Sequence, residues 1–425
     1  MIHKIKGTQD FINLELFNFI VTQAKTHLAE YNFQEVATPI LEPTELFKRA
    51  VGEHTDVVSK EMFTIQQHGE QKEDREEICL RPEHTAAMMR AYLENDLYHS
   101  LPAPWKAFTY GPMFRYERPQ KGRFRQFHQI SLEIIDSHNI SEDVRFISML
   151  DSFFKTKLKL NNYALQLNFL GTPADRASYR LELVNFLEQV NAQICETCRV
   201  RKTKNPLRIF DCKSPTCQAA YEAAPVITDA LSPESRAEWE LLQQQLALLS
   251  VSFVCKPTLV RGLDYYNKTV FEFVSTDLGA QNSFCGGGRY DQLASLIGAK
   301  QDYPSVGAGI GIERLMLLLE TQINNLNLPT KPALTVILPL APAQTTMALL
   351  LAQELNHKNL CVDVILEQTS VKSMMRKANR LGAKFAVLIG ESEQQAHVAT
   401  VKNMVNGTEE TIKQLDLANY LLQSI

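Results

Sequence analysis

The chain has 425 residues, of which 45% are hydrophobic and 22% charged, and its formal net charge is −4. This composition is typical of an ordinary globular protein of two or three domains, and the mild negative charge argues against a protein that coats DNA. Eight cysteines and no apolar export signal predict a reducing, cytoplasmic setting without disulfides. Every apolar run is too short to span a membrane.

The N-terminal third alternates between helical and extended patterns. Residues 11–31 carry apolar side chains at helical spacing, which predicts a helix. The polar stretch 66–77 is typical of a hairpin tip. After it, the segment ICLRPEHTAAMMRAYL changes from a strand pattern to a helix pattern near Pro82.

Residues 114–133, FRYERPQKGRFRQFHQISLE, predict two strands joined by a turn at residues 118–122. Because strand side chains alternate between two faces, Gln129 and Glu133 share a mostly polar face, and Arg115 and Glu117 share a face on the outgoing strand. Such a sheet floor suits a ligand with phosphate and amine groups, since Arg presents a planar fork of donors to phosphate. The alternative is a solvated hairpin with a basic turn.

Residues 171–249 lose the strand pattern and predict a mainly helical insert. The pairs Cys195-x-x-Cys198 and Cys212-x4-Cys217 lie within it. They are either a tetrahedral Zn²⁺ site, with a second spacing looser than usual, or four reduced thiols. A basic cluster covers residues 199–213.

Strand alternation returns after residue 258, where Arg261 begins the segment RGLDYY. A second arginine near a phosphate site would stabilise charge on a transferring phosphoryl group, whereas the alternative is a surface arginine before a buried tyrosine pair. A helix is expected over residues 290–297.

Residues 307–311, GAGIG, resemble a dinucleotide-binding loop. Their spacing is GxGxG rather than GxGxxG, and no βαβ unit follows, so that function is rejected. The glycines are expected to let a helix that carries Glu313 and Arg314 pack tightly against the sheet, with Arg314 in its first turn.

A linker at residues 324–332 precedes three compact apolar segments, ALTVILPL, VDVILE and KFAVLIG, which are separated by helical stretches. This alternation predicts a small α/β domain.

Taken together, these segments resemble a class II aminoacyl-tRNA synthetase, specifically the bacterial histidyl-tRNA synthetases. KGTQD (residues 6–10) resembles the N-terminal signature, the segment around Pro39 the dimer-interface motif, the hairpin the second class motif, and GIGIERL (309–315) the third. RGLDYY and GGGRYD (286–291) resemble the two signatures of the histidine enzymes. The resemblance implies an α+β fold: an antiparallel-sheet catalytic domain over residues 1–325, a helical insertion at about 171–250, and an α/β anticodon-binding domain over 331–425.

The resemblance also implies a reaction. ATP and L-histidine would form histidyl-adenylate and pyrophosphate, and histidine would then pass to the 3'-terminal adenosine of tRNA(His). Arg115 would hold the α-phosphate, Glu117 the adenine and Arg314 the γ-phosphate. Arg261 would stabilise charge at the α-phosphorus during attack by the histidine carboxylate, and Mg²⁺ would accompany ATP.

A histidine pocket follows from the same resemblance, built from eight residues: Glu83, His84, Thr85, Gln129, Glu133, Tyr265, Tyr266 and Tyr290. Glu133 and Tyr266 would hydrogen-bond the two imidazole nitrogens. Glu83, Thr85 and Gln129 would bind the α-amino group and its surroundings. His84 departs from the family pattern, in which a small residue is expected between Glu83 and Thr85.

The remaining expectations concern partners. Arg118, Lys121 and Arg123 at the hairpin turn would meet the acceptor end of the tRNA, and the chain would form a homodimer. Two rival functions are a non-catalytic regulatory subunit of ATP phosphoribosyltransferase, which should lack the C-terminal domain and the arginines, and a zinc-dependent nucleic-acid-binding module built on the cysteines.

Overall fold

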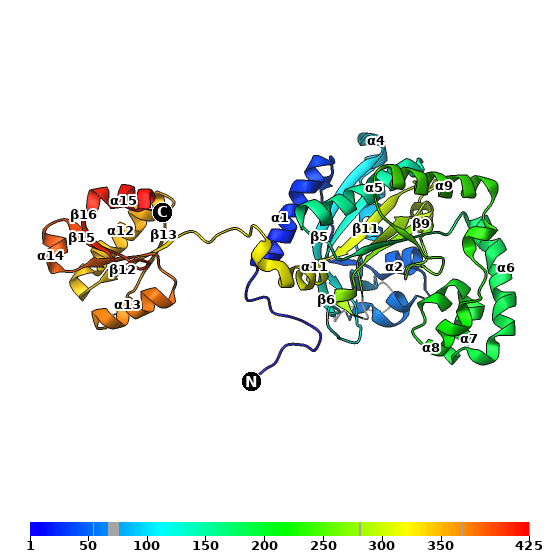
Figure 1. The fold of residues 1–425 in the computed structure, drawn as a ribbon, viewed down its shortest axis with the longest axis horizontal. Coiled ribbons are helices and arrows are strands. Elements are labelled where there is room, and N and C mark those ends of the chain that lie inside the picture. Colours follow the sequence, from blue (N-terminus) through cyan, green and yellow to red (C-terminus); the bar gives the residue numbers. More distant parts are fainter. Residues whose placement is uncertain (54, 67–75, 280–281, 368, 425) are drawn as a thin grey trace. The chain divides into compact units, whose positions relative to one another are not determined.

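The computed structural model describes residues 1–53, 55–66, 76–279, 282–367 and 369–424. The chain divides into two compact units, Met1–Leu328 and Pro329–Ile425, each with its own sheet (Figure 1). Within the described ranges no helix is both long and apolar enough to cross a membrane.

The first unit is built on an eight-stranded sheet in the order β1-β5-β6-β11-β10-β9-β7-β8. The six strands from β5 to β7 in this order pair antiparallel, and the two-residue edge strands β1 and β8 pair parallel. The strands are β1 (Gln34–Glu35), β5 (Trp105–Phe114), β6 (Gln126–Ile135), β7 (Ala164–Phe169), β8 (Val254–Cys255), β9 (Asn267–Val274), β10 (Ser283–Arg289) and β11 (Val306–Gly311).

The predicted hairpin is confirmed as β5 and β6, which pair from Trp105↔Ile135 to Phe114↔Gln126. Its two faces differ as the alternation predicts. Ile130, Leu132 and Ile134 of β6 are buried in an apolar core, whereas Gln129 and Glu133 point to the opposite face.

One face of the sheet is covered by helices whose apolar stripes form that core (Figure 1). The predicted N-terminal helix is α1, and α5, α9 and α11 lie on the same face. Ile20 of α1, Phe146 of α5 and Leu246 of α9 are each fully or almost fully buried there. The helices are α1 (Glu15–Glu30), α5 (Ile140–Ser152), α9 (Pro233–Leu248) and α11 (Ile312–Leu319).

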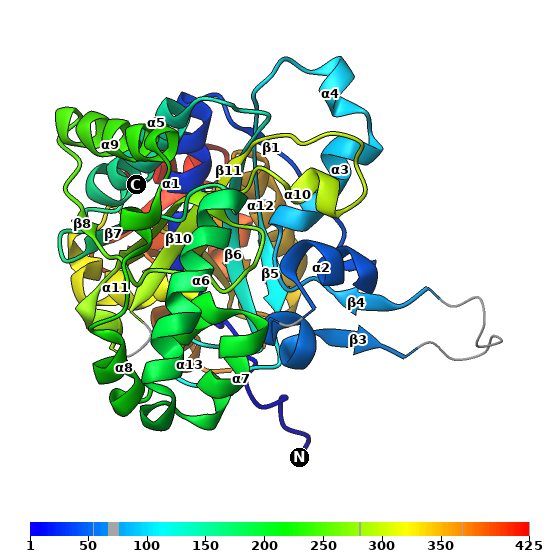
Figure 2. The same ribbon diagram turned by 90° about the vertical axis from the view of Figure 1, so that its right-hand side faces the viewer.

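A small three-stranded sheet, β2-β4-β3, lies beside the main sheet with α2, α3, α4 and α10. β3 and β4 pair antiparallel and project from the body (Figure 2). Residues 67–75 of the predicted hairpin tip fall outside the described residues. The elements are β2 (Leu41–Pro43), α2 (Thr44–Val51), β3 (Phe63–Ile65), β4 (Ile78–Leu80), α3 (Thr85–Glu94), α4 (Leu97–Ser100) and α10 (Leu293–Leu296).

The helix predicted over residues 290–297 is shorter than expected. Arg289 still pairs with Val306 in the sheet, and the Tyr290 N–H donates to the Ser305 carbonyl at 2.8 Å. Because these sheet bonds continue through Tyr290, the chain turns into α10 only at Leu293.

The insert is helical, as predicted, and residues 170–253 contain no strand. Thr172 and Asp175 form a reciprocal capping box at the start of its first helix, which fixes the entry from β7. Its helices are α6 (Pro173–Gln189), α7 (Glu196–Lys204), α8 (Pro215–Tyr221) and the already named α9.

The second unit contains a five-stranded sheet in the order β13-β12-β14-β15-β16. β12 pairs parallel with β13 and β14, which confirms the predicted strand–helix alternation, but β14, β15 and β16 pair antiparallel. The last two strands were not predicted, because charged residues interrupt their apolar pattern. The elements are β12 (Leu334–Pro339), α12 (Thr345–His357), β13 (Cys361–Val364), α13 (Val371–Arg380), β14 (Phe385–Ile389), α14 (Glu391–Gln395), β15 (Val398–Asn403), β16 (Glu409–Lys413) and α15 (Leu417–Ser424).

Candidate active site

A cavity of about 740 Å³ opens over the polar face of the main sheet in the first unit. Its walls come from the β5–β6 hairpin, the segment before β9, strands β10 and β11, the first turn of α11, and the insert. This size is in the range of small-molecule sites in proteins. Segments distant in the sequence, including the hairpin and RGLDYY, therefore meet at one cavity.

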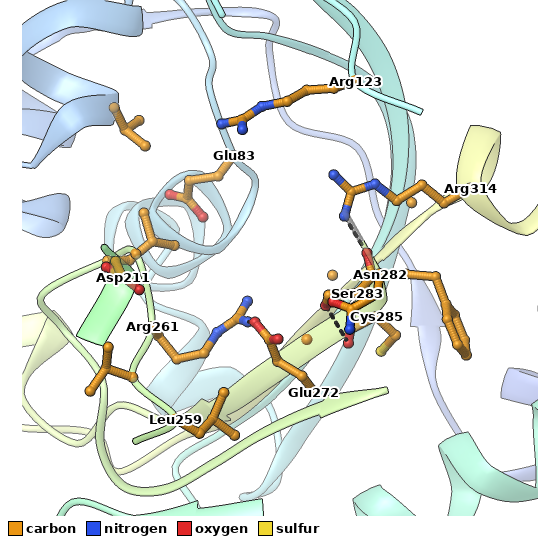
Figure 3. A pocket seen from close by; sticks show the side chains of 18 of the residues that line it. Glu83, Arg123, Asp211, Leu259, Arg261, Glu272, Asn282, Ser283, Cys285 and Arg314 are labelled. Carbon is orange, nitrogen blue, oxygen red and sulfur yellow. Dashed lines mark hydrogen bonds and ion pairs between the residues drawn. The ribbon is translucent and has the colours of Figure 1, made fainter. Parts of the chain in front are cut away.

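Four arginines line this cavity: Arg115, Arg123, Arg261 and Arg314. Figure 3 shows Arg123, Arg261 and Arg314 directed toward a shared space from different elements. The Arg115 Nε donates to the Pro82 carbonyl at 2.9 Å, and the Arg314 Nε donates to the Gly122 carbonyl at 3.1 Å. These anchors fix the guanidinium groups in advance of ligand binding.

The arginines affect one another electrostatically. Burial, with the added repulsion of Arg123, lowers the pKa of Arg314 to about 10, and burial lowers the pKa of Arg115. Burial opposes the charge of Arg261 too, but the ion pair with Glu272 outweighs it and raises the pKa of Arg261. All three stay charged at neutral pH, so the cavity attracts a polyanion such as a triphosphate.

Deeper than the arginines, Glu133 of β6 is fully buried. The Thr85 hydroxyl donates to its Oε1 at 2.7 Å, and the Tyr290 hydroxyl donates to its Oε2. Burial raises the pKa of Glu133 to about 8. A carboxyl group near its ionisation point, with two hydroxyl partners, suits a ligand that carries nitrogen donors.

Glu83 lies at the start of α3, where it accepts the backbone N–H groups of Thr85 at 2.6 Å and Ala86 at 2.9 Å. Burial raises the pKa of Glu83. Glu83, Thr85 and Gln129 all line the cavity, so the predicted amino-group residues are brought together.

The glycines of β11 serve a different purpose from the predicted one. They lie within the strand, opposite β6, and not in a loop before α11. A methyl group at Gly307 would collide with the Glu133 carboxylate, and one at Gly309 with the Gln129 amide. The missing side chains therefore leave room for these two residues.

The three predicted tyrosines form one aromatic cluster. Ring centroids lie 4.5 Å apart for Tyr265 and Tyr266 and 5.5 Å apart for Tyr265 and Tyr290. Tyr265 and Tyr266 line the cavity, whereas Glu133 and Tyr290 lie behind the lining, and Thr85, which does line it, donates to Glu133. The buried Tyr265 hydroxyl has no hydrogen-bond partner within the described part of the chain.

His84 does not line the cavity. It is buried at the start of α3, and its Nδ1 lies 3.0 Å from the Ser131 hydroxyl. Burial, with the nearby charge of Arg81, holds the pKa of His84 well below its usual range. The side chain is thus neutral and lies behind Ser131, which lines the cavity.

The structure separates the three basic residues of the turn. Arg118 and Lys121 are exposed. Arg123 instead lines the cavity and forms an ion pair with Glu117, which was expected to meet adenine. The sequence grouped them because it shows only that they are close along the chain.

Sequence reasoning missed Glu272 and Lys213, which also line the cavity. Glu272 is the acidic residue in the otherwise apolar segment VFEFV of β9, and this isolated charge was a signal. Lys213 belongs to the predicted basic cluster of the insert, but no local pattern indicates that the insert reaches the cavity.

Comparisons with known proteins show the family. A family model described as histidyl-tRNA synthetase matches residues 18–315, and an anticodon-binding-domain model matches residues 335–424. The chain belongs to the histidyl-tRNA synthetase family. It is 37% identical to a histidine–tRNA ligase of Clostridioides difficile, over 99% of each chain. It is 42% identical to one from Nitratidesulfovibrio vulgaris, over 99% of this chain and 98% of that one.

Among solved structures, the apo histidyl-tRNA synthetase of S. aureus superposes with a TM-score of 0.80 at 32% identity, over 99% of both chains. The expected α+β fold, with an antiparallel-rich sheet, a helical insert and a C-terminal anticodon-binding domain, is confirmed.

Proposed function

We propose that this cavity activates L-histidine with ATP and then transfers it to the 3'-terminal adenosine of tRNA(His). As a member of the histidyl-tRNA synthetase family, the chain is an ATP-dependent histidine–tRNA ligase. The observation that carries the proposal is that Arg115, Arg261 and Arg314 line one cavity with Thr85, whose hydroxyl donates to the buried Glu133 directly behind the cavity wall.

We assign the arginine end of the cavity to ATP. Arg115, held by the Pro82 carbonyl, binds the α-phosphate, and Arg314 binds the γ-phosphate. Glu117 lies beside them and binds the adenine, after exchanging its contact with Arg123. Mg²⁺ enters with ATP as part of the substrate, with most of its coordination supplied by phosphate and water oxygens.

We assign the buried end to histidine. Glu133 and Tyr266 hydrogen-bond the imidazole nitrogens, and Glu83, Thr85 and Gln129 bind the α-amino group. A side chain without imidazole would leave these buried groups unpaired, which discriminates by as much as about 10⁴–10⁵. Tyr265 packs against the ring, and Tyr290 supports Tyr265 from behind the cavity wall.

The first step places the histidine carboxylate in line with the α-phosphorus. Its oxygen forms a bond to phosphorus as the bond to the pyrophosphate oxygen breaks, and the electron pair leaves with pyrophosphate. The carboxylate is already ionised, so this step requires no general base. Arg261, fixed by Glu272, stabilises the charge that develops on the α-phosphoryl oxygens.

We further assign the tRNA contacts, the oligomeric state and the compartment. Arg118 and Lys121 contact the tRNA phosphates at the acceptor end, and the second unit binds the anticodon arm. The chain acts in the cytoplasm as a homodimer. The exposed apolar residues Ile40 and Leu41, next to Pro39, support that interface, with 42% and 52% of their surfaces accessible.

The test is ATP–pyrophosphate exchange, with each amino acid in turn. Exchange is expected with histidine alone. Exchange with another amino acid, or with none, would contradict the proposal. An absence of exchange would instead favour the regulatory-subunit alternative, which the retained anticodon-binding domain argues against.

A further inference from the structure

The two cysteine pairs of the insert come together in space. The Sγ atoms of Cys195, Cys198, Cys212 and Cys217 all lie within 4.8 Å of one another, and those of Cys195 and Cys212 are 3.9 Å apart. A tetrahedral zinc ion with Zn–S bonds of about 2.3 Å requires sulfur–sulfur separations of about 3.8 Å. The four thiols therefore stand close to the arrangement that zinc needs.

The surroundings of the sulfur atoms suit thiolates. The Cys195 N–H donates to the Cys217 Sγ at 3.1 Å, and the Ser214 N–H donates to the Cys212 Sγ at 3.5 Å. Such donors orient metal-bound sulfur and offset its negative charge. Tyr221 lies beside Cys198, but its buried hydroxyl makes no hydrogen bond of ordinary geometry within the described residues. A charged thiolate would supply the missing acceptor.

The helices that carry Cys198 and Cys217 bury few side chains. Among the nine residues of α7, all of them described, Cys198 alone is buried. In α8 the buried residues are Cys217 and Tyr221. Helices this short and this poorly packed are marginal in water, and small modules of this kind depend on a metal or another cross-link.

We propose that Cys195, Cys198, Cys212 and Cys217 bind one structural Zn²⁺ ion through four thiolates. Binding displaces the four thiol protons and leaves a complex of net charge −2, with every coordination position taken by protein. Such a closed site has no place for substrate, so the ion takes no part in either step of the reaction.

The proposed zinc site also adjoins the active-site cavity, because Cys212 belongs to both. Phe210, Asp211, Cys212 and Lys213 line the cavity wall, and Arg208 donates to the Arg261 carbonyl at 3.1 Å. A zinc ion on Cys212 therefore fixes the segment 210–213 against the ATP site. Its loss is expected to loosen this wall and weaken ATP binding, while the sheet remains folded.

The test uses untagged full-length protein, since a histidine tag binds metal itself. Purified protein analysed by inductively coupled plasma mass spectrometry is expected to hold about one zinc per chain. Cys198→Ser and Cys217→Ser are expected to lose it. Cys255→Ser and Cys361→Ser change the two exposed cysteines and are the matched controls, which keep the zinc.

A second measurement remains decisive if a variant fails to fold. Wild-type protein stripped of zinc and reloaded with Co²⁺ is expected to show visible bands of a tetrahedral thiolate complex. Wild-type protein without zinc that takes up none after anaerobic reduction would overturn the proposal. So would zinc retained by Cys198→Ser, iron in place of zinc, or a disulfide between Cys195 and Cys212.

Discussion

The two ends of the active-site cavity recognise their ligands by different physical means. At the ATP end, partly exposed arginines are tied to backbone carbonyls and repel one another until an anion arrives. At the histidine end, Glu133 and Tyr290 are buried and bonded to each other before any ligand enters. The first end attracts charge, whereas the second selects shape and hydrogen-bond pattern. Substitutions at the two ends should therefore impair different steps: the rate of adenylation at the ATP end and the binding of histidine at the other.

The largest effect is expected from Arg261→Ala. Loss of a donor directed at charge in the transition state slows adenylation by about 10³-fold, as for oxyanion-hole donors, while histidine still binds. Single-turnover adenylate formation measures it. Arg236→Ala, an exposed arginine of the insert, is the control. An unchanged adenylation rate would show that Arg261 does not stabilise the charge that develops on the α-phosphoryl oxygens.

The next largest effect is expected from Glu133→Gln. The amide leaves one of the buried hydroxyl or imidazole donors unpaired, which raises the KM for histidine by about 10²-fold and leaves the KM for ATP nearly unchanged. Steady-state pyrophosphate exchange measures both constants, and Glu182→Gln on the exposed side of α6 is the control. An equal rise in both constants would mean that the two ends are not separate.

The same variant tests the raised pKa of Glu133. The folded pKa is about 8, above an unfolded value of about 4.3. The folded state therefore binds more protons between these values, and stability falls as the pH rises from 5 toward 8. Urea unfolding of wild type should show this fall, and Glu133→Gln should show less of it. Because Glu83 remains in both proteins, the difference isolates Glu133.

A smaller effect is expected from Gly307→Ala, which sharpens the role of the strand glycines. The new methyl group displaces the Glu133 carboxylate and raises the KM for histidine by about tenfold, an overpacking cost of about 1–3 kcal/mol. Gly311→Ala, where a methyl would lie 3.6 Å from Arg314, should have the weaker effect. If the two variants matched, the close approach at Gly307 would be unimportant.

The smallest effect is expected at the hairpin turn. Replacing Arg118 and Lys121 together with alanine should weaken tRNA charging more than pyrophosphate exchange, since exchange proceeds without tRNA. The slope of the logarithm of tRNA affinity against the logarithm of salt concentration should become less negative by about one for each lost phosphate contact. Filter binding across a salt series measures it, and an unchanged slope would exclude both residues from the interface.

The sequence predicted the elements whose periodicity is strong and local. The β5–β6 hairpin, with Gln129 and Glu133 on one face, follows from side-chain alternation, and α11 begins one or two residues before Glu313 and Arg314 as expected. The sequence did not predict which distant segments pair with one another. The glycines of β11 make sense only opposite β6, and Arg123 turns inward to Glu117. The β15–β16 pair, with polar and exposed residues, gave no clear strand signal.

The most direct test is to measure the binding of histidine and of ATP separately, by isothermal titration calorimetry, to wild type, Arg261→Ala and Glu133→Gln. If the two ends of the cavity bind their ligands separately, each variant keeps its affinity for the ligand of the other end. Arg261→Ala keeps histidine affinity, and Glu133→Gln keeps ATP affinity while losing histidine. Loss of histidine binding in Arg261→Ala, or of ATP binding in Glu133→Gln, would contradict the division.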